Sequence, residues 1–380
     1  MQNIVLLIFY FNFSILNQAY VLKNTFNQEA IISSLFNFNQ INYLAIGLEN
    51  GNINILDYKN EIFLYNFNRN NGGHISIVTS FVSLEDGNLV SGSDDATIKI
   101  WDMTNGLLKY TFDKSNGGHI HFVKALCLLE NGFLASGSSG GEIKIWDAVH
   151  GRLKCSFDKF NAYGHSMWIN QLVSLEGNYL ASCSMDKTIK IWDITNCALK
   201  YTFNNTNGGH TDYVNVLAIL ENGNIASGSY DATIKIWDTS NGVLLHTFDQ
   251  FQDNGHTASV ISLASLGNNY LASGSQDTLL KIWDLNSFKL EYTFGSSNDG
   301  HSRRVSYLIL IDENRLVSAD GGGVIKVWNV TNQNLRYTFN QSNGGHLEAI
   351  SGLVLLDNNY IASASQDKTI KIWNLNDNFN

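Results

Sequence analysis

Apolar and polar residues alternate over short runs of this chain, and the runs return in a fixed order. Within residues 74–113 this pattern predicts four strands, at residues 78–84, 89–93, 97–101 and 107–112. The segments between these strands are rich in Asp, Asn and Gly, which favour tight turns. The pattern therefore predicts a four-stranded antiparallel sheet built from consecutive hairpins.

Both faces of this sheet are apolar. In the third strand, Ile98 and Ile100 point to one face and Trp101 points to the other. Because each face exposes large apolar groups to its surroundings, each needs a cover. A similar sheet on either side would provide it, and a closed ring of such sheets leaves no face uncovered.

The chain repeats this unit at an almost constant interval. Each unit begins with Gly-His, and the seven histidines follow one another by 45 or 46 residues: His74, His119, His165, His210, His256, His301 and His346. Tryptophans keep the same rhythm: Trp101, Trp146, Trp192, Trp237, Trp283, Trp328 and Trp373. These sets take seven of the 10 His and seven of the 8 Trp, so most of these residues belong to a structural repeat.

With Gly-His at the start and Trp-Asp closing the third strand, the units resemble those of WD-repeat β-propellers. In the last two units Trp-Asp becomes Trp328-Asn329 and Trp373-Asn374. The resemblance covers residues 20–380. It implies an all-β fold, a single β-propeller in which each unit forms one four-stranded blade.

The number of blades follows from the two ends of the repeat. Forty-five residues before Trp101 the chain reads Leu56-Asp57, which indicates a degenerate unit ahead of the seven clear ones. The last unit stops after its third strand, while residues 21–26 (VLKNTF) resemble the outer strand LLKYTF. We therefore predict eight four-stranded blades closed by an N-terminal outer strand. The alternative is a seven-bladed ring with the degenerate unit displaced.

Five units contain a His/Ser/Asp set, which has the residue types of a hydrolase triad. Its recurrence in five units argues against catalysis, because an enzyme does not need five triads. The resemblance instead implies a structural hydrogen-bond chain from Trp through Ser and His to Asp in each blade. Its members are His74, Ser91, Asp95, Trp101, His165, Ser182, Asp186, Trp192, His210, Ser227, Asp231, Trp237, His256, Ser273, Asp277, Trp283, His346, Ser363, Asp367 and Trp373. We expect no catalytic residue.

Three units depart from this set. Gly140 and Gly322 stand at the turn-Asp position, and Asp320 is placed to substitute in the second case. In the degenerate first unit, Glu29 stands near the position of the histidine, while Ile46, Asn50 and Leu56 replace Ser, Asp and Trp. We expect packing alone to hold that unit.

With so regular a template, function should reside where equivalent exposed positions differ. The resemblance implies that the third residue after each His, and the residue before the turn Asp, lie around the channel entrance. In neighbouring units these positions carry a set of large side chains typical of interface hot spots: Phe122, Trp168, Met185, Tyr213 and Tyr230. Across the ring, Arg303 and Arg304 form a small cationic sector. We predict that a protein or peptide partner binds this face.

Charge and composition exclude other classes. The net charge of −10 argues against non-specific nucleic-acid binding. Cys127, Cys155, Cys183 and Cys197 lack metal-ligand spacing, and we interpret them as reduced thiols. Loops such as DKSNGG lack the acidic density of a calcium site. We expect no cofactor, no metal and no membrane span, and a monomeric propeller within a complex.

Residues 1–19 form a separate apolar segment ahead of the propeller at residues 20–380. The run 4–16 (IVLLIFYFNFSIL) is too short for a transmembrane helix and has the length of a signal-peptide core, although no basic residue precedes it. It also fits an eroded repeat. We expect a cytoplasmic protein, or a secreted one if residues 1–19 are a signal peptide.

Three functions fit the chain. We favour a non-catalytic interaction scaffold. The alternative is a substrate-recognition subunit of a larger complex such as a ubiquitin ligase. A propeller enzyme ranks below both, because the unmatched His121, His150 and His246 lie in different repeats.

Overall fold

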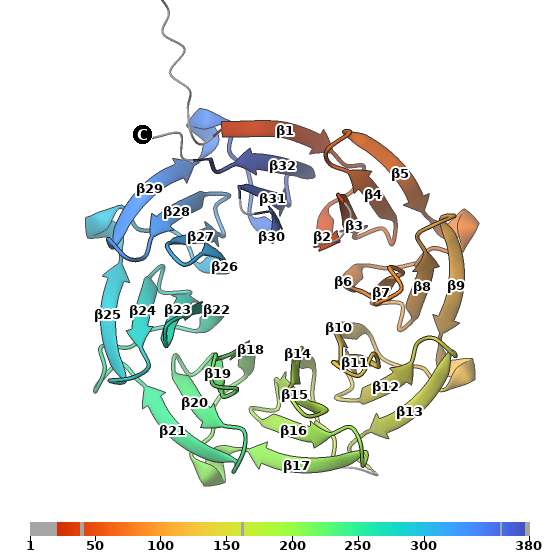
Figure 1. Cartoon of the computed structure of the whole chain (residues 1–380), viewed down its shortest axis with the longest axis horizontal. Helices are drawn as coiled ribbons and strands as arrows, with labels where there is room; N and C mark the ends of the chain where they lie inside the picture. Colours follow the sequence, from red (N-terminus) through yellow and green to blue (C-terminus); the bar gives the residue numbers. More distant parts are fainter. Residues whose placement is uncertain (1–20, 39–41, 161–162, 358, 377–380) are drawn as a thin grey trace, which may run out of the picture.

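The computed structural model describes residues 21–38, 42–160, 163–357 and 359–376. In this part of the chain, eight four-stranded antiparallel sheets stand around a central axis as the blades of a closed propeller (Figure 1). The predicted fold class is confirmed. No helix among the described residues has the length and apolar character needed to cross a bilayer.

The strands follow the chain from the inner to the outer edge of each blade. Blades 1 to 4 consist of β2 (Ile32–Phe38), β3 (Tyr43–Leu48), β4 (Ile53–Asp57), β5 (Ile62–Phe67); β6 (Val78–Ser83), β7 (Leu89–Ser93), β8 (Ile98–Asp102), β9 (Leu107–Phe112); β10 (Val123–Leu128), β11 (Leu134–Ser138), β12 (Ile143–Asp147), β13 (Arg152–Phe157); β14 (Ile169–Leu175), β15 (Tyr179–Ser184), β16 (Ile189–Asp193) and β17 (Ala198–Phe203). Blades 5 to 8 consist of β18 (Val214–Ile219), β19 (Ile225–Ser229), β20 (Ile234–Asp238), β21 (Val243–Phe248); β22 (Val260–Gly267), β23 (Tyr270–Ser275), β24 (Leu280–Asp284), β25 (Lys289–Phe294); β26 (Val305–Asp312), β27 (Arg315–Asp320), β28 (Ile325–Asn329), β29 (Asn334–Phe339); β30 (Ile350–Asp357), β31 (Tyr360–Ser365), β32 (Thr369–Asn374) and β1 (Val21–Asn27).

The two ends of the chain meet in blade 8. Its strand order is β1-β32-β31-β30, so the N-terminal strand forms the outer edge of the sheet that contains the C-terminal strands. β1 runs antiparallel to β32, from the pair Val21 and Asn374 to the pair Asn27 and Thr369. The degenerate unit forms a complete blade 1, β2–β5. Eight blades are therefore confirmed, and the seven-bladed alternative is wrong.

Apolar side chains fill the spaces between blades. Ile98 and Ile100 face blade 3, whereas Trp101 packs against blade 1, as the alternation in the sequence predicts. The Trp101 ring lies on Phe67, the last residue of the preceding outer strand, with 4.2 Å between the ring centroids. The same pair recurs around the ring, from Phe112 and Trp146 to Phe339 and Trp373. Seven of the eight outer strands are thereby fixed to the blade that follows; the exception is β1, because blade 1 has Leu56 in place of tryptophan.

Short turns connect most outer strands to the next blade. Among the described residues, five of these turns contain a 3₁₀ helix: η1 (Arg69–Asn71), η2 (Lys114–Asn116), η3 (Asn205–Asn207), η4 (Ser296–Asn298) and η5 (Gln341–Asn343). In η2, Asp113 accepts a hydrogen bond from the Ser115 amide, and Gly117 adopts a left-handed conformation with φ of 86°. A Cβ on the next residue, Gly118, would lie 2.5 Å from the Asp113 carbonyl oxygen. The Asn-Gly-Gly-His sequence thus serves the turn.

Candidate partner-binding face

In blade 2, four side chains form one hydrogen-bonded chain. The Trp101 indole donates to the Ser91 hydroxyl at 2.9 Å, and Ser91 lies 2.8 Å from Nε2 of His74. Nδ1 of His74 lies 3.0 Å from the Asp95 carboxylate. The network assigns the proton of a neutral ring to Nδ1, which donates to Asp95, while Ser91 donates to Nε2.

Burial and hydrogen bonding together determine the protonation states of His74 and Asp95. Burial lowers the pKa of His74 below its ordinary value, so the buried ring is neutral. Burial alone would raise the pKa of Asp95, but the hydrogen bonds from His74 and Thr97 outweigh it and hold the pKa well below its usual range. A neutral histidine donating to a carboxylate fastens the turn after β7 to the loop before β6. It cannot act as a base through Nε2 without losing the Ser91 bond.

The structure brings the same four residue types together in the other predicted units. The distances between His Nδ1 and the carboxylate are 2.8 to 3.0 Å for the pairs His165 and Asp186, His210 and Asp231, His256 and Asp277, and His346 and Asp367. The matching indoles donate to Ser182, Ser227, Ser273 and Ser363 at 2.7 to 2.9 Å.

In two further blades the same hydrogen-bond network ends on a carboxylate at a different position of the turn. In blade 3, Glu142 lies 3.2 Å from Nδ1 of His119, while Ser136 lies between His119 and Trp146. In blade 7, Asp320 takes this part, 2.9 Å from Nδ1 of His301. Asp320 was expected from the sequence. Glu142 was missed, because it lies two residues beyond the aligned position and only the turn geometry directs it back to the histidine.

Blade 1 corrects one expectation. Packing does hold it, since Ile46 and Leu56 are fully buried. It also has a polar fastener of its own: Glu29 accepts hydrogen bonds from Asn50, at 3.3 Å, and from Asn52. The prediction that packing alone holds this blade was therefore wrong. Glu29 joins the loop before β2 to the turn before β4, as the histidine and aspartate pair does in other blades.

The variable positions pair with one another within each blade. The amide of Met185 donates to the carbonyl of Trp168 at 3.0 Å, and the amide of Tyr230 donates to the carbonyl of Tyr213 at 2.9 Å. The Tyr213 and Tyr230 rings meet edge to face, 5.6 Å apart. Each pair therefore joins the loop before a blade to the turn between its second and third strands, at one end of the propeller.

Lys124 connects the aromatic residues of two neighbouring blades. Its Nζ lies 5.5 Å from the centre of the Phe122 ring and 5.1 Å from the centre of the Trp168 ring. The same Nζ forms an ion pair with Asp94 of blade 2 at 2.6 Å. Sequence comparison of the repeats missed Lys124, since its rings come from different units and meet only in the folded ring.

We call the surface formed by Asp94, Phe122, Lys124, Trp168, Met185, Tyr213 and Tyr230 the aromatic face. Phe122 is 46% exposed, Trp168 39% and Tyr230 46%. A contiguous group of exposed rings is typical of an interaction surface, whereas exposed rings that stand singly are not. Cation–π contacts with Lys124 hold two of these rings in place without burying them.

The predicted cationic sector lies in blade 7. Arg303 and Arg304 are both exposed. They lie over two of the three glycines in the turn at residues 321–323: a Cβ on Gly321 would be 3.1 Å from Cγ of Arg304, and a Cβ on Gly322 would be 3.1 Å from Cγ of Arg303. The glycines that interrupt the repeat here make room for the arginine side chains.

The cysteines need a correction. Cys155, in β13, and Cys197, in the turn after β16, form a disulfide between blades 3 and 4, with Cα atoms 5.7 Å apart. The interpretation of all four as reduced thiols was wrong. Cys127 and Cys183 are free. Burial raises the pKa of Cys127 to about 11 and that of Cys183 beyond its usual range, so neither is a reactive thiolate.

Across residues 21–38, 42–160, 163–357 and 359–376, no group of three His, Cys, Asp or Glu side chains is arranged to hold an ion. In four of the described loops that contain a 3₁₀ helix, a side-chain oxygen caps that helix; Asn204, for example, accepts a hydrogen bond from the Thr206 amide.

Comparison with known proteins agrees with this geometry. The family profile described as WD domain, G-beta repeat, matches residues 65–102, 156–193, 199–238, 242–284 and 335–374, more than half of the chain. The first three strands of blades 1, 3 and 7, whose carboxylate is displaced or replaced, fall outside these matches. No curated protein matches the chain. It is similar to the crystal structure of the computationally designed Ika8 protein, with a TM-score of 0.76 and 27% identity over 92% of this chain and 97% of that one.

Proposed function

Because the chain belongs to the WD40-repeat family, we propose that it is a non-catalytic scaffold that binds a protein or peptide partner through the aromatic face. WD40 propellers generally act as protein-interaction scaffolds. Here the recurring polar residues are occupied in fastening the blades. The chain's own differences between repeats therefore carry recognition.

The observation that carries the proposal is the arrangement around Lys124. Two exposed rings from neighbouring blades share one cation, which is also paired with Asp94. A partner that covers this group gains apolar and aromatic contact without ordering mobile side chains. Across the ring, Arg303 and Arg304 suit an acidic group on the same partner.

Replacing both Trp168 and Tyr213 by alanine is the test. We expect partner capture to be lost, because central aromatic residues of an interface each contribute about 2 kcal/mol or more, roughly 30-fold in affinity. We expect the melting temperature to change little, because both side chains lie outside the spaces between blades. Affinity capture with quantitative mass spectrometry, beside thermal unfolding, measures both.

The control alters exposed residues at the same end of two other blades. Gln276 and Gln366 are exposed and occupy the places of Tyr230 and Met185. Their double alanine variant should capture the same partners as the unaltered protein. If the Trp168 and Tyr213 variant unfolds, or captures every partner, the aromatic face is not the binding surface.

The disulfide supports the secretory alternative for the location of the protein. Disulfides persist in oxidising compartments and are rare in the cytosol. Under denaturing conditions we expect alkylation to label two thiols before reduction and four after it, since Cys127 and Cys183 are free. N-terminal sequencing of the secreted protein should begin after residue 19. Four labelled thiols before reduction, in protein from its native source, would favour the cytoplasm.

A further inference from the structure

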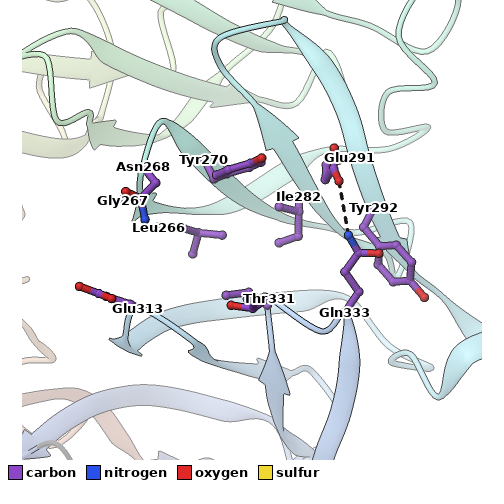
Figure 2. Close-up of a pocket in the computed structure, with 11 residues that line it drawn as sticks. Leu266, Gly267, Asn268, Tyr270, Ile282, Glu291, Tyr292, Glu313, Thr331 and Gln333 are labelled. Carbon is purple, nitrogen blue, oxygen red and sulfur yellow. Dashed lines mark hydrogen bonds between the residues drawn. The ribbon is translucent and has the colours of Figure 1, made fainter.

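A groove of about 290 Å³ lies between blades 6 and 7 (Figure 2). Its floor is apolar, with Leu266 and Ile282, and the ring of Tyr270 stands over it. It opens among the turns between the first and second strands and between the third and fourth. The aromatic face lies at the turns between the second and third strands. Since hairpin turns alternate between strand ends, the groove is on the opposite side of the ring.

Three sibling blades show what occupies this position. Each has an aromatic residue at the start of its second strand and a lysine in its outer strand. The lysine Nζ lies over the centre of the ring at 3.9 Å for Lys154 and Phe133, 3.8 Å for Lys200 and Tyr179, and 5.1 Å for Lys23 and Tyr360. An ammonium group over an aromatic face is a favourable pairing, and the lysine stem covers apolar surface beside it.

Blade 6 keeps the ring and reverses the charge. Tyr270 begins β23 as Tyr179 begins β15, but the outer-strand position of Lys200 is taken by Glu291. Glu291 accepts a hydrogen bond from Gln333 at 3.4 Å. A second carboxylate, that of Glu313, stands at the other end of the groove (Figure 2). Among the described residues, those lining the groove include no lysine or arginine.

We propose that this groove binds a lysine side chain of a partner polypeptide, in the place that an internal lysine fills in blades 3, 4 and 8. The stem lies along Leu266 and Ile282, and the ammonium group faces Tyr270 within reach of a carboxylate. The other blades show how such a lysine would lie. In blade 6 the Tyr270 ring is present, but Glu291 stands where those blades have a lysine. The negative charge of Glu291 favours an ammonium group that comes from a partner. The site is separate from the aromatic face and does not depend on it.

The direct test uses the peptide acetyl-Gly-Lys-Gly-amide and its norleucine counterpart, which keeps the stem and lacks the charge. Binding is followed by the amide resonances of residues 266–270 and 331–333. We expect the lysine peptide to shift these resonances and to bind roughly tenfold more tightly than the norleucine peptide, with the difference shrinking at high salt. Equal binding of the two peptides, or tighter binding of an arginine peptide, would overturn the assignment.

Glu291→Lys provides the matched variant. Its own lysine should lie over Tyr270 as Lys200 lies over Tyr179, so the variant should fold and lose peptide binding. Glu130→Lys, an exposed turn residue at the same end of blade 3, makes the same charge change and should bind as the unaltered protein does. If Glu291→Lys fails to fold, Glu291→Gln should still weaken binding severalfold. Unchanged binding in the Glu291 variants, or equal loss in Glu130→Lys, contradicts the proposal.

Different variants test the lysine groove and the scaffold function, so either proposal can be contradicted without the other. The Trp168 and Tyr213 double alanine variant should bind the lysine peptide normally. The Glu291→Lys variant should retain those partners that dock only on the aromatic face.

Discussion

Removing residues 1–27 is expected to leave the propeller at least about 5 kcal/mol less stable than removing residues 1–20 alone. The longer deletion takes away β1, the outer strand of blade 8. With it go the ladder to β32 and the packing of Leu22 and Phe26, which lie against the cores on the two sides of the blade. Truncation of a fully buried apolar side chain commonly costs about 2–5 kcal/mol; Leu22 and Phe26 are each partly buried, and the deletion removes both together with the ladder to β32.

The loss should extend beyond blade 8. Without β1, the backbone groups of β32 become an unpaired edge, which favours pairing with a second chain. Chemical denaturation measures the stability, and size-exclusion chromatography detects the association. A point variant, Leu22→Ala with Phe26→Ala, should reproduce much of the loss. Leu107→Ala, at a 62% exposed position of another outer strand, should change stability by less than about 0.5 kcal/mol. A monomeric 1–27 deletion as stable as the 1–20 deletion would show that β1 does not close the ring.

The closure was predictable because each strand type has its own local pattern. Residues 21–26 keep the outer-strand pattern of residues 107–112, and the chain lacks that strand only at its end. The degenerate first blade was also detectable, since Leu56 keeps an apolar side chain where Trp101 stands in the next unit. Position within a 45-residue repeat therefore sufficed to predict eight blades.

Contacts between residues of different repeats could not be predicted by comparing equivalent positions of the repeats. Cys155 and Cys197 occupy unrelated repeat positions, yet stacking of blades 3 and 4 brings their Cα atoms to 5.7 Å. Lys124 meets the Trp168 ring of the next blade for the same reason. Glu142 reaches His119 from a shifted position because a turn, rather than a strand, carries it. The lysine pattern broken at Glu291 was visible in the sequence, but its meaning depended on knowing that Lys200 lies over Tyr179.

The second large effect concerns pH. The free energy of unfolding should fall steeply as the pH is lowered below about 6.5. The blades contain seven histidines whose side chains are fully buried. Burial lowers the pKa of every one of them in the folded protein. In the unfolded chain they return to the ordinary value of about 6.5.

The sign follows from the protons bound by each state. Below about pH 6.5 the unfolded histidines take up protons that the folded, neutral rings do not, so acid favours unfolding. Well above that pH neither state binds these protons, and the histidines no longer make the stability depend on pH. Each histidine contributes up to about 1.4 kcal/mol per pH unit. The partner aspartates, such as Asp95, add to the loss at lower pH. Their folded pKa is depressed, so the unfolded carboxylates are protonated first, below about pH 3.9.

Urea denaturation between pH 5 and pH 8 measures this slope, which counts the protons taken up on unfolding. His165→Gln should lower the slope by about one proton, because one buried neutral ring is removed. It should also lower stability at pH 8, since Ser182 and Asp186 lose their partner. His150→Gln controls for the loss of a histidine at an exposed position. A flat profile from pH 7.5 to pH 5.5, or a slope that His165→Gln leaves intact, would mean that the buried rings take up protons as readily as those of the unfolded chain and are charged at acid pH. In that case, ion pairs with the carboxylates rather than neutral hydrogen bonds would fasten the blades.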